Sequence, residues 1–249
     1  MANPIAPSIT QSGRLEPFEL QVGRGQVFGH TEVNVQGYNA LQHNSFRAVW
    51  ELSNTTDYVF PAGLVTMAFT STLAETLVMR VDGLDASCAP KTAIITFTAG
   101  TTGVVTSGTA DFFRINAMQI TQGTSVGTIS ATNGGVTYAQ IAVGVGRSQA
   151  SIYTVPAGYT FYLTRSQAFT TNNGTQFCTY RVWSRTFVSG ISTVSVVLNA
   201  PFTQVYSSTR ITARAYPEKT DVQWQLMQSN PAPGSIQLEG ILIKNDGTL

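Results

Sequence analysis

The chain has 249 residues, with 14 Lys or Arg, 13 Asp or Glu and a formal net charge of +1. Charged residues make up 11% of the chain, against about 25% in a typical soluble domain. This balance creates no field that would attract nucleic acid or an anionic membrane, so we expect neither as a direct partner. Subunit interfaces are depleted of charge, and the composition therefore favours a protein covered by neighbours.

The sequence shows no targeting or membrane signal. Residues 1–7 lack a basic segment followed by an apolar one, and no later stretch approaches roughly 18 uninterrupted apolar residues. We therefore expect neither standard secretion nor a membrane span. Cys88 and Cys178 lie too far apart for a Cys-x-x-Cys motif. Two buried free thiols are the favoured interpretation, and a single disulfide is the alternative.

Residues 1–50 are rich in Gly, Pro, Asn and Gln, and their apolar residues are scattered. Period-2 alternation is limited to residues 19–22 and 31–35, which predicts two short strands. We interpret residues 1–50 as an extended N-terminal arm that lies on a partner. The alternative is that they form an edge of the main domain.

Short alternating segments separated by turn residues recur from residue 51 onwards, as expected for a β-sandwich or barrel. The predicted strands are 66–70, 76–81, 93–98, 113–120, 127–131, 136–141, 151–155, 160–164, 178–183, 195–198, 210–215, 221–226 and 236–243. The predicted class is all-β, sandwich or jelly-roll-like. Residues 51–146 and 147–249 form either two packed sandwich regions or a single domain.

The residues needed for common catalytic sites are scarce. His30 and His43 are the only histidines, both lie in the first 50 residues, and neither has a neighbourhood typical of a catalytic base. The chain also lacks a Gly-x-Ser-x-Gly elbow, a Walker loop and a His-Glu-x-x-His motif. We therefore predict no enzyme, no catalytic residues and no cofactor.

One acidic cluster suggests carboxylate chemistry. Asp82 and Asp85 are close in sequence and are candidates for a glycosidase pair, and together with Glu75 they are candidates for a Ca²⁺ site. The spacing does not match an EF-hand loop. We interpret Asp82-Gly83 as a turn after a strand, with the aspartate bonded to local backbone, and expect no metal.

Large aromatic residues occur in the strand-like segments, and their expected role is core packing. The alternative is an exposed surface that stacks on sugar rings or anchors a partner. The residues concerned are Trp50, Trp183, Trp224, Tyr153, Tyr159 and Tyr162.

Several phrases, in this order, resemble a family of structural proteins encoded by tailed bacteriophages, including marine and cyanobacterial phages. They are Tyr58-Val59-Phe60-Pro61, Ser71-Thr72-Leu73-Ala74-Glu75-Thr76, Arg80-Val81-Asp82-Gly83-Leu84-Asp85, residues 152–164, and Pro217-Glu218-Lys219-Thr220-Asp221. The resemblance implies a virion protein of the head, the head-tail junction or the tail, with no catalytic residues to carry over.

These observations predict a non-enzymatic virion protein, made in the cytoplasm of the host bacterium, whose partners are itself and other virion proteins. We expect a symmetric homo-oligomer. The alternative function is a glycan-binding module of a phage fibre or appendage.

Overall fold

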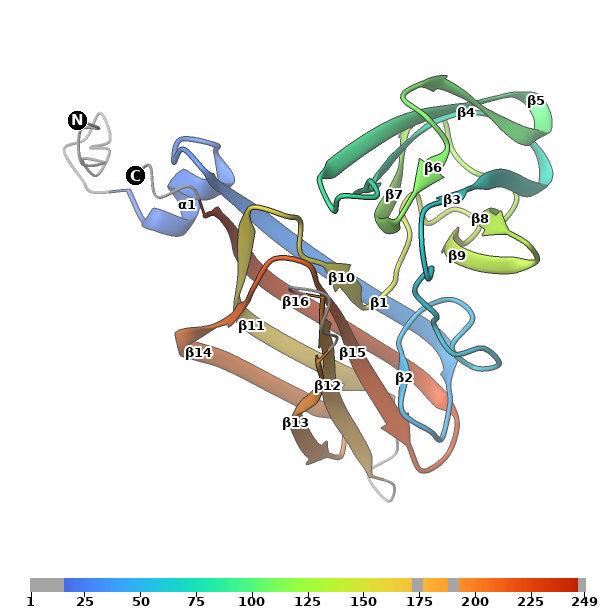
Figure 1. Cartoon of the computed structure of the whole chain (residues 1–249). Coiled ribbons are helices and arrows are strands. Elements are labelled where there is room, and N and C mark those ends of the chain that lie inside the picture. The colour runs from blue at the N-terminus through green and yellow to red at the C-terminus, as the bar shows by residue number, and fades with distance from the viewer. Residues whose placement is uncertain (1–15, 172–176, 188–192, 246–249) are drawn as a thin grey trace, which may run out of the picture.

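The computed structural model describes residues 16–171, 177–187 and 193–245, which are mainly antiparallel strands (Figure 1). This confirms the all-β sandwich class expected from the sequence. The strands form two units: a sandwich unit, built from both ends of the chain, and an inserted unit, built from residues 65–141. The chain therefore leaves the sandwich after β2 and returns to it at β10.

The sandwich unit has two antiparallel sheets that share one core. The first has the order β1 (His30–Gln42), β16 (Ala232–Lys244), β11 (Tyr159–Thr170), β14 (Val205–Tyr216). The second has the order β10 (Ile152–Thr154), β15 (Thr220–Gln228), β12 (Cys178–Thr186), β13 (Thr193–Phe202), and β2 (Arg47–Ala48) also pairs with β15. Alternate residues of both sheets point inward, so that Phe161, Leu238, Tyr180 and Trp224 pack together.

The inserted unit has its own core. Its strands are β3 (Val65–Thr66), β4 (Ala68–Leu84), β5 (Pro90–Ser107), β6 (Asp111–Phe112), β7 (Arg114–Gln122), β8 (Ile129–Asn133) and β9 (Val136–Ile141). The predicted strands 66–70 and 76–81 are largely parts of β4, whose pairing is irregular between Thr70 and Glu75. Glu75 is buried there and accepts hydrogen bonds from Ser71 Oγ and Gly127 N–H at 2.9 and 2.6 Å.

Residues 30–42 form an edge of the main domain, the second of the two alternatives for the N-terminal region. β1 pairs with β16 from His30↔Ile243 to Gln42↔Ala232, so the first and last strands of the described structure lie side by side (Figure 1). Val35 of this strand belongs to the sandwich core. The first part of the arm expected for residues 1–50, residues 1–15, lies outside the described residues.

The strand predicted at residues 19–22 is wrong, because these residues belong to helix α1 (Phe18–Gly23). Four residues are too few to separate a period of 2 from one of 3.6. In the helix, Gln21 and Val22 are buried together and Leu20 is 51% exposed. No helix in the described ranges is long and apolar enough to cross a membrane.

The turn predicted at Asp82-Gly83 is also wrong, because both residues lie within β4. A Cβ atom on Gly83 would lie 2.1 Å from the carbonyl oxygen of Arg114, so the glycine permits the close approach of β7. The turn comes later, at Asp85, whose Oδ1 accepts from the N–H groups of Ser87 and Ala89 at 2.8 and 2.9 Å. The cysteines, Cys88 within this turn and Cys178 in β12, are both buried thiols and are not joined in a disulfide.

The close contact of β1 with residues 49 and 151 is testable at Gly37. A Cβ atom there would lie 2.3 Å from the carbonyl oxygen of Val49 and 2.7 Å from Cβ of Ser151. We expect Gly37→Ala to lower the free energy of unfolding by about 1–3 kcal/mol in urea denaturation. The matched control Gly63→Ala, with open space around the new methyl group, should change it by less than about 0.5 kcal/mol. Equal effects would contradict the packing described.

Candidate functional site

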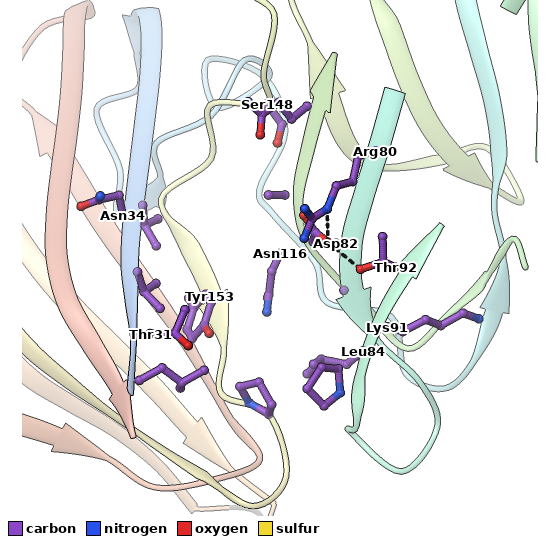
Figure 2. Close-up of a pocket in the computed structure, with 18 of the residues that line it drawn as sticks. Thr31, Asn34, Arg80, Asp82, Leu84, Lys91, Thr92, Asn116, Ser148 and Tyr153 are labelled. Carbon is purple, nitrogen blue, oxygen red and sulfur yellow. Dashed lines mark hydrogen bonds and ion pairs between the residues drawn. The ribbon is translucent and has the colours of Figure 1, made fainter. Parts of the chain in front are cut away.

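A cleft of about 540 Å³ lies between the sandwich unit and the inserted unit. Figure 2 shows Thr31 and Asn34 of β1 on one wall and Arg80, Asp82 and Thr92 on the other. Tyr153 of β10 and Asn116 of β7 lie between these walls. Because the walls belong to different units, the shape of the cleft depends on how the two units are joined.

A buried ion pair joins the units. Arg114 of β7 donates from Nε and Nη2 to the two carboxylate oxygens of Asp221 of β15, at 2.8 and 2.9 Å. The two side chains are 2% and 0% exposed. Such a bidentate pair fixes direction as well as distance, since the guanidinium group and the carboxylate are both planar.

Further hydrogen bonds and a ring contact surround the two charged groups of this pair. Arg114 Nη1 donates to the carbonyl oxygens of Pro61 and Phe113 at 2.6 and 2.8 Å, and the guanidinium group lies 3.8 Å from the centre of the Phe113 ring. Asp221 also accepts from Thr154 Oγ1 and Arg185 Nη2 at 2.7 and 2.9 Å. A buried pair with this many partners strongly restricts the relative position of the units.

Asn116 adds a second connection. Its Nδ2 donates to the carbonyl oxygen of Thr154 at 3.0 Å, and its Oδ1 accepts from the Thr154 N–H at 2.9 Å. The side chain therefore pairs with β10 as a neighbouring strand would. Arg114, Asn116 and Asp221 were not singled out from the sequence; their only signal is a polar residue within an otherwise strand-like segment.

The cleft walls carry charged side chains that are hydrogen-bonded to neighbours on the same wall. On β4, Arg80 Nε donates to Asp82 Oδ1 at 2.8 Å, and Thr92 Oγ1 donates to the same oxygen at 2.8 Å. On β1, Asn34 Nδ2 donates to Glu32 Oε1 at 2.7 Å. The cleft thus presents both signs of charge beside amide and hydroxyl groups.

The aromatic residues considered from the sequence divide between core and cleft. Trp50 and Trp224 are fully buried, which confirms core packing for these two. Trp183 is partly buried and its ring stacks on that of Phe60, with 6.4 Å between the ring centroids. Tyr153 is 8% exposed and belongs to the sandwich core, and Tyr159 is partly buried against that core; both also line the cleft. Tyr162 lies in β11, between β14 and β16.

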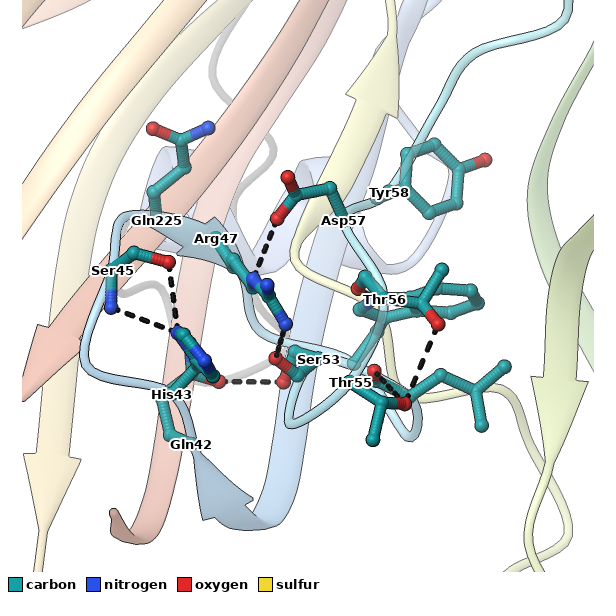
Figure 3. Close-up of polar contacts among 12 residues, drawn as sticks. Gln42, His43, Ser45, Arg47, Ser53, Thr55, Thr56, Asp57, Tyr58 and Gln225 are labelled. Atoms are coloured by element: carbon teal, nitrogen blue, oxygen red, sulfur yellow. Dashed lines mark hydrogen bonds and ion pairs between the residues drawn. The ribbon is translucent and has the colours of Figure 1, made fainter.

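The two histidines make short-range contacts. His30 Nδ1 lies 2.9 Å from the carbonyl oxygen of Phe28, and its ring meets Phe18 edge to face. His43 Nδ1 accepts from the N–H of Ser45 at 3.1 Å and lies 2.8 Å from Ser45 Oγ (Figure 3). Both contacts reach residues two positions away, which is typical of a turn.

The polar network in Figure 3 also organises the connection from β2 towards the inserted unit. Arg47 forms an ion pair with Asp57, with 2.6 Å between Nε and Oδ1, and its Nη1 donates to the carbonyl oxygen of Ser53 at 3.2 Å. Ser53 Oγ donates to Gln42 Oε1 at 2.6 Å. These contacts tie the connection back to β1.

The acidic candidates do not come together. Glu75 supports the irregularity in β4, Asp82 pairs with Arg80, and Asp85 caps its turn, where hydrogen bonds from Ser87 lower the pKa of its carboxyl group. Among the described residues there is no group of three or more His, Cys, Asp or Glu positioned to hold a metal ion.

Glu51 links the two chain segments that connect the sandwich unit with the inserted unit. Its Oε1 accepts from the N–H of Gln149 at 2.9 Å, while its Oε2 is buried without a hydrogen-bond partner in the described structure. Burial raises the pKa of Glu51 to about 8. The carboxyl group is therefore mostly protonated at neutral pH.

Comparison of the chain with protein-family models, curated proteins and solved structures gives no match.

The buried ion pair yields a first prediction about the junction. Asp221→Asn leaves the Arg114 charge uncompensated, and we expect the free energy of unfolding to fall by about 3–5 kcal/mol in urea denaturation. The control Glu239→Gln breaks an exposed pair with Arg165, whose atoms lie 3.5 Å apart, and should cost less than about 1 kcal/mol. A similar small effect for both variants would show that the junction does not depend on the buried pair.

A second prediction concerns pH. Between about pH 4.5 and 8 the folded state keeps a proton on Glu51 that the unfolded state has released. The contribution of Glu51 to the free energy of unfolding should therefore fall as pH rises through this window, by at most about 1.4 kcal/mol per pH unit. Glu51→Gln should remove this slope in urea denaturation across the window, and Glu239→Gln should retain it. An unchanged slope in Glu51→Gln would contradict the assignment.

Proposed function

We propose that the chain is a non-enzymatic structural subunit of a tailed-phage virion, assembling with copies of itself and with other virion proteins on the head, the head-tail junction or the tail. The observation that carries self-association is the free edge of the sandwich unit. β13 ends the second sheet and β14 ends the first, so one side of the sandwich presents two successive edge strands (Figure 1).

This β13–β14 edge carries exposed apolar side chains. Val194 and Val196 on β13, and Val205 and Ile211 on β14, are each at least 50% exposed. Edge strands with exposed apolar groups favour pairing with another chain, because their unpaired N–H and C=O groups remain available. The low proportion of charged residues supports the same proposal.

The phage assignment is supported by the residue phrases described above. Three of them contain residues of the junction: Phe60 contacts the Arg114 guanidinium group, Thr154 donates to Asp221, and Asp221 pairs with Arg114. These phrases therefore include packing positions of this fold, as a structural protein would require.

Self-association is tested by charging the β13–β14 edge. We expect the wild type to form an oligomer in light scattering, and the double variant Val196→Lys/Ile211→Lys to be at least partly dissociated at the same concentration, because lysines block edge pairing. The control Val104→Lys places the same charge on the exposed β5 and should leave the oligomer intact. A monomeric wild type, or equal behaviour of both variants, would reject the proposed surface.

The virion assignment has a separate test. Mass spectrometry of purified particles of the phage that encodes the chain should detect it as a component that resists salt washing. Its absence from complete particles would overturn the assignment.

A further inference from the structure

We propose that the cleft between the two units binds a neutral oligosaccharide. The hydroxyl groups of the sugar would form hydrogen bonds with the polar side chains of the walls, and one face of a sugar ring would pack on Tyr159. This inference adds a ligand to a structural subunit and does not rest on self-association.

The cleft has the size and construction of a ligand site. Its volume of about 540 Å³ falls within the range of roughly 300–1,000 Å³ usual for small-molecule pockets. The Arg114–Asp221 pair and the two hydrogen bonds of Asn116 hold its walls in place. A preformed site avoids the entropic cost of ordering the walls when the ligand binds.

The β4 wall presents a donor beside an acceptor. Arg80 and Asp82 have side chains that are 52% and 34% exposed, and their ion pair uses Nε and Oδ1. Within the described structure no hydrogen bond is made by the terminal nitrogens of Arg80 or by Oδ2 of Asp82. Neighbouring hydroxyl groups of a sugar each donate and accept, so they match this pair, and bonds to charged groups are the stronger kind.

The charges of the cleft favour a neutral ligand. Arg80 is balanced by Asp82, and among the other lining residues Arg147 and Glu32 carry opposite charges. Lys91 lines the cleft, but its ammonium group bonds to Thr109 Oγ1 and the carbonyl oxygen of Asp111. Figure 2 shows this side chain directed away from Tyr153. The lining residues thus carry three positive and two negative charges, and because Lys91 is directed away from Tyr153, a phosphate or polyanion would meet little excess of positive charge.

An extended peptide fits the β1 wall less well. A peptide that adds to β1 as a strand would compete with Arg147, whose Nη2 donates to the carbonyl oxygen of Asn34 at 3.5 Å. Tyr159, which is partly exposed, offers an aromatic surface in the cleft, whereas Tyr153 and Pro156 also line the cleft but are buried. Rings of this kind pack on the C–H face of a sugar while leaving its hydroxyl groups free to bond.

The test is saturation-transfer NMR on the full chain with maltohexaose, cellohexaose and chitohexaose as probes, and an uncharged hexapeptide as the competing class. We expect signals for at least one oligosaccharide. The variant Arg80→Ala/Asp82→Ala should weaken its binding at least about tenfold, because two charged hydrogen-bonding groups are lost. The control Arg165→Ala/Glu239→Ala removes an exposed pair outside the cleft and should bind as the wild type does.

Absence of a signal for all three oligosaccharides would overturn the proposal, as would equal binding by the two double variants. Binding of the peptide alone would replace it with a peptide site. Near-ultraviolet circular dichroism checks that both variants are folded. Light scattering on the same samples reports the oligomer, so a failure of ligand binding is distinguishable from a failure of self-association.

Discussion

The buried pair of Arg114 and Asp221 is the interaction on which the arrangement of the two units depends. Removing two charges from water is costly, and the cost is offset only when the remaining hydrogen-bonding groups are satisfied. Here the carbonyl oxygens of Pro61 and Phe113 and the side chains of Thr154 and Arg185 complete the set. These partners come from both units and from the connection between them. A displaced inserted unit would leave several of them unpaired at once.

The cleft follows from this junction. β7 carries Arg114 at its first residue and Asn116 two positions later, and both side chains reach the sandwich unit. The opposite wall is β1, held through its pairing with β16 and its close contact at Gly37. The site is therefore a product of packing between units, each with its own core.

The two proposed surfaces occupy different parts of the molecule. The β13–β14 edge lies at the edge of both sandwich sheets (Figure 1), whereas the cleft is lined by residues of β1 and of the inserted unit. Self-association through the former would leave the latter open to a ligand. A subunit arranged in this way presents a ligand site on each copy, so that several weak sites on one assembly would act together.

Local pattern by itself determined the strand class of this protein. Apolar and polar residues alternate with a period of 2 over 113–120 and over 221–226, and this period is visible within each short segment. The structure has β7 and β15 at these positions. Four alternating residues at 19–22 are too few to exclude a helix. The sequence around Asp82-Gly83 suggests a turn because the strand that packs against Gly83, β7, begins about thirty positions later in the chain. Only the tertiary structure decided the pairing of β1 with β16, the meeting of Arg114 with Asp221 and the cleft between the units. These contacts join residues distant in sequence, and their energies depend on burial and geometry, which no local window contains.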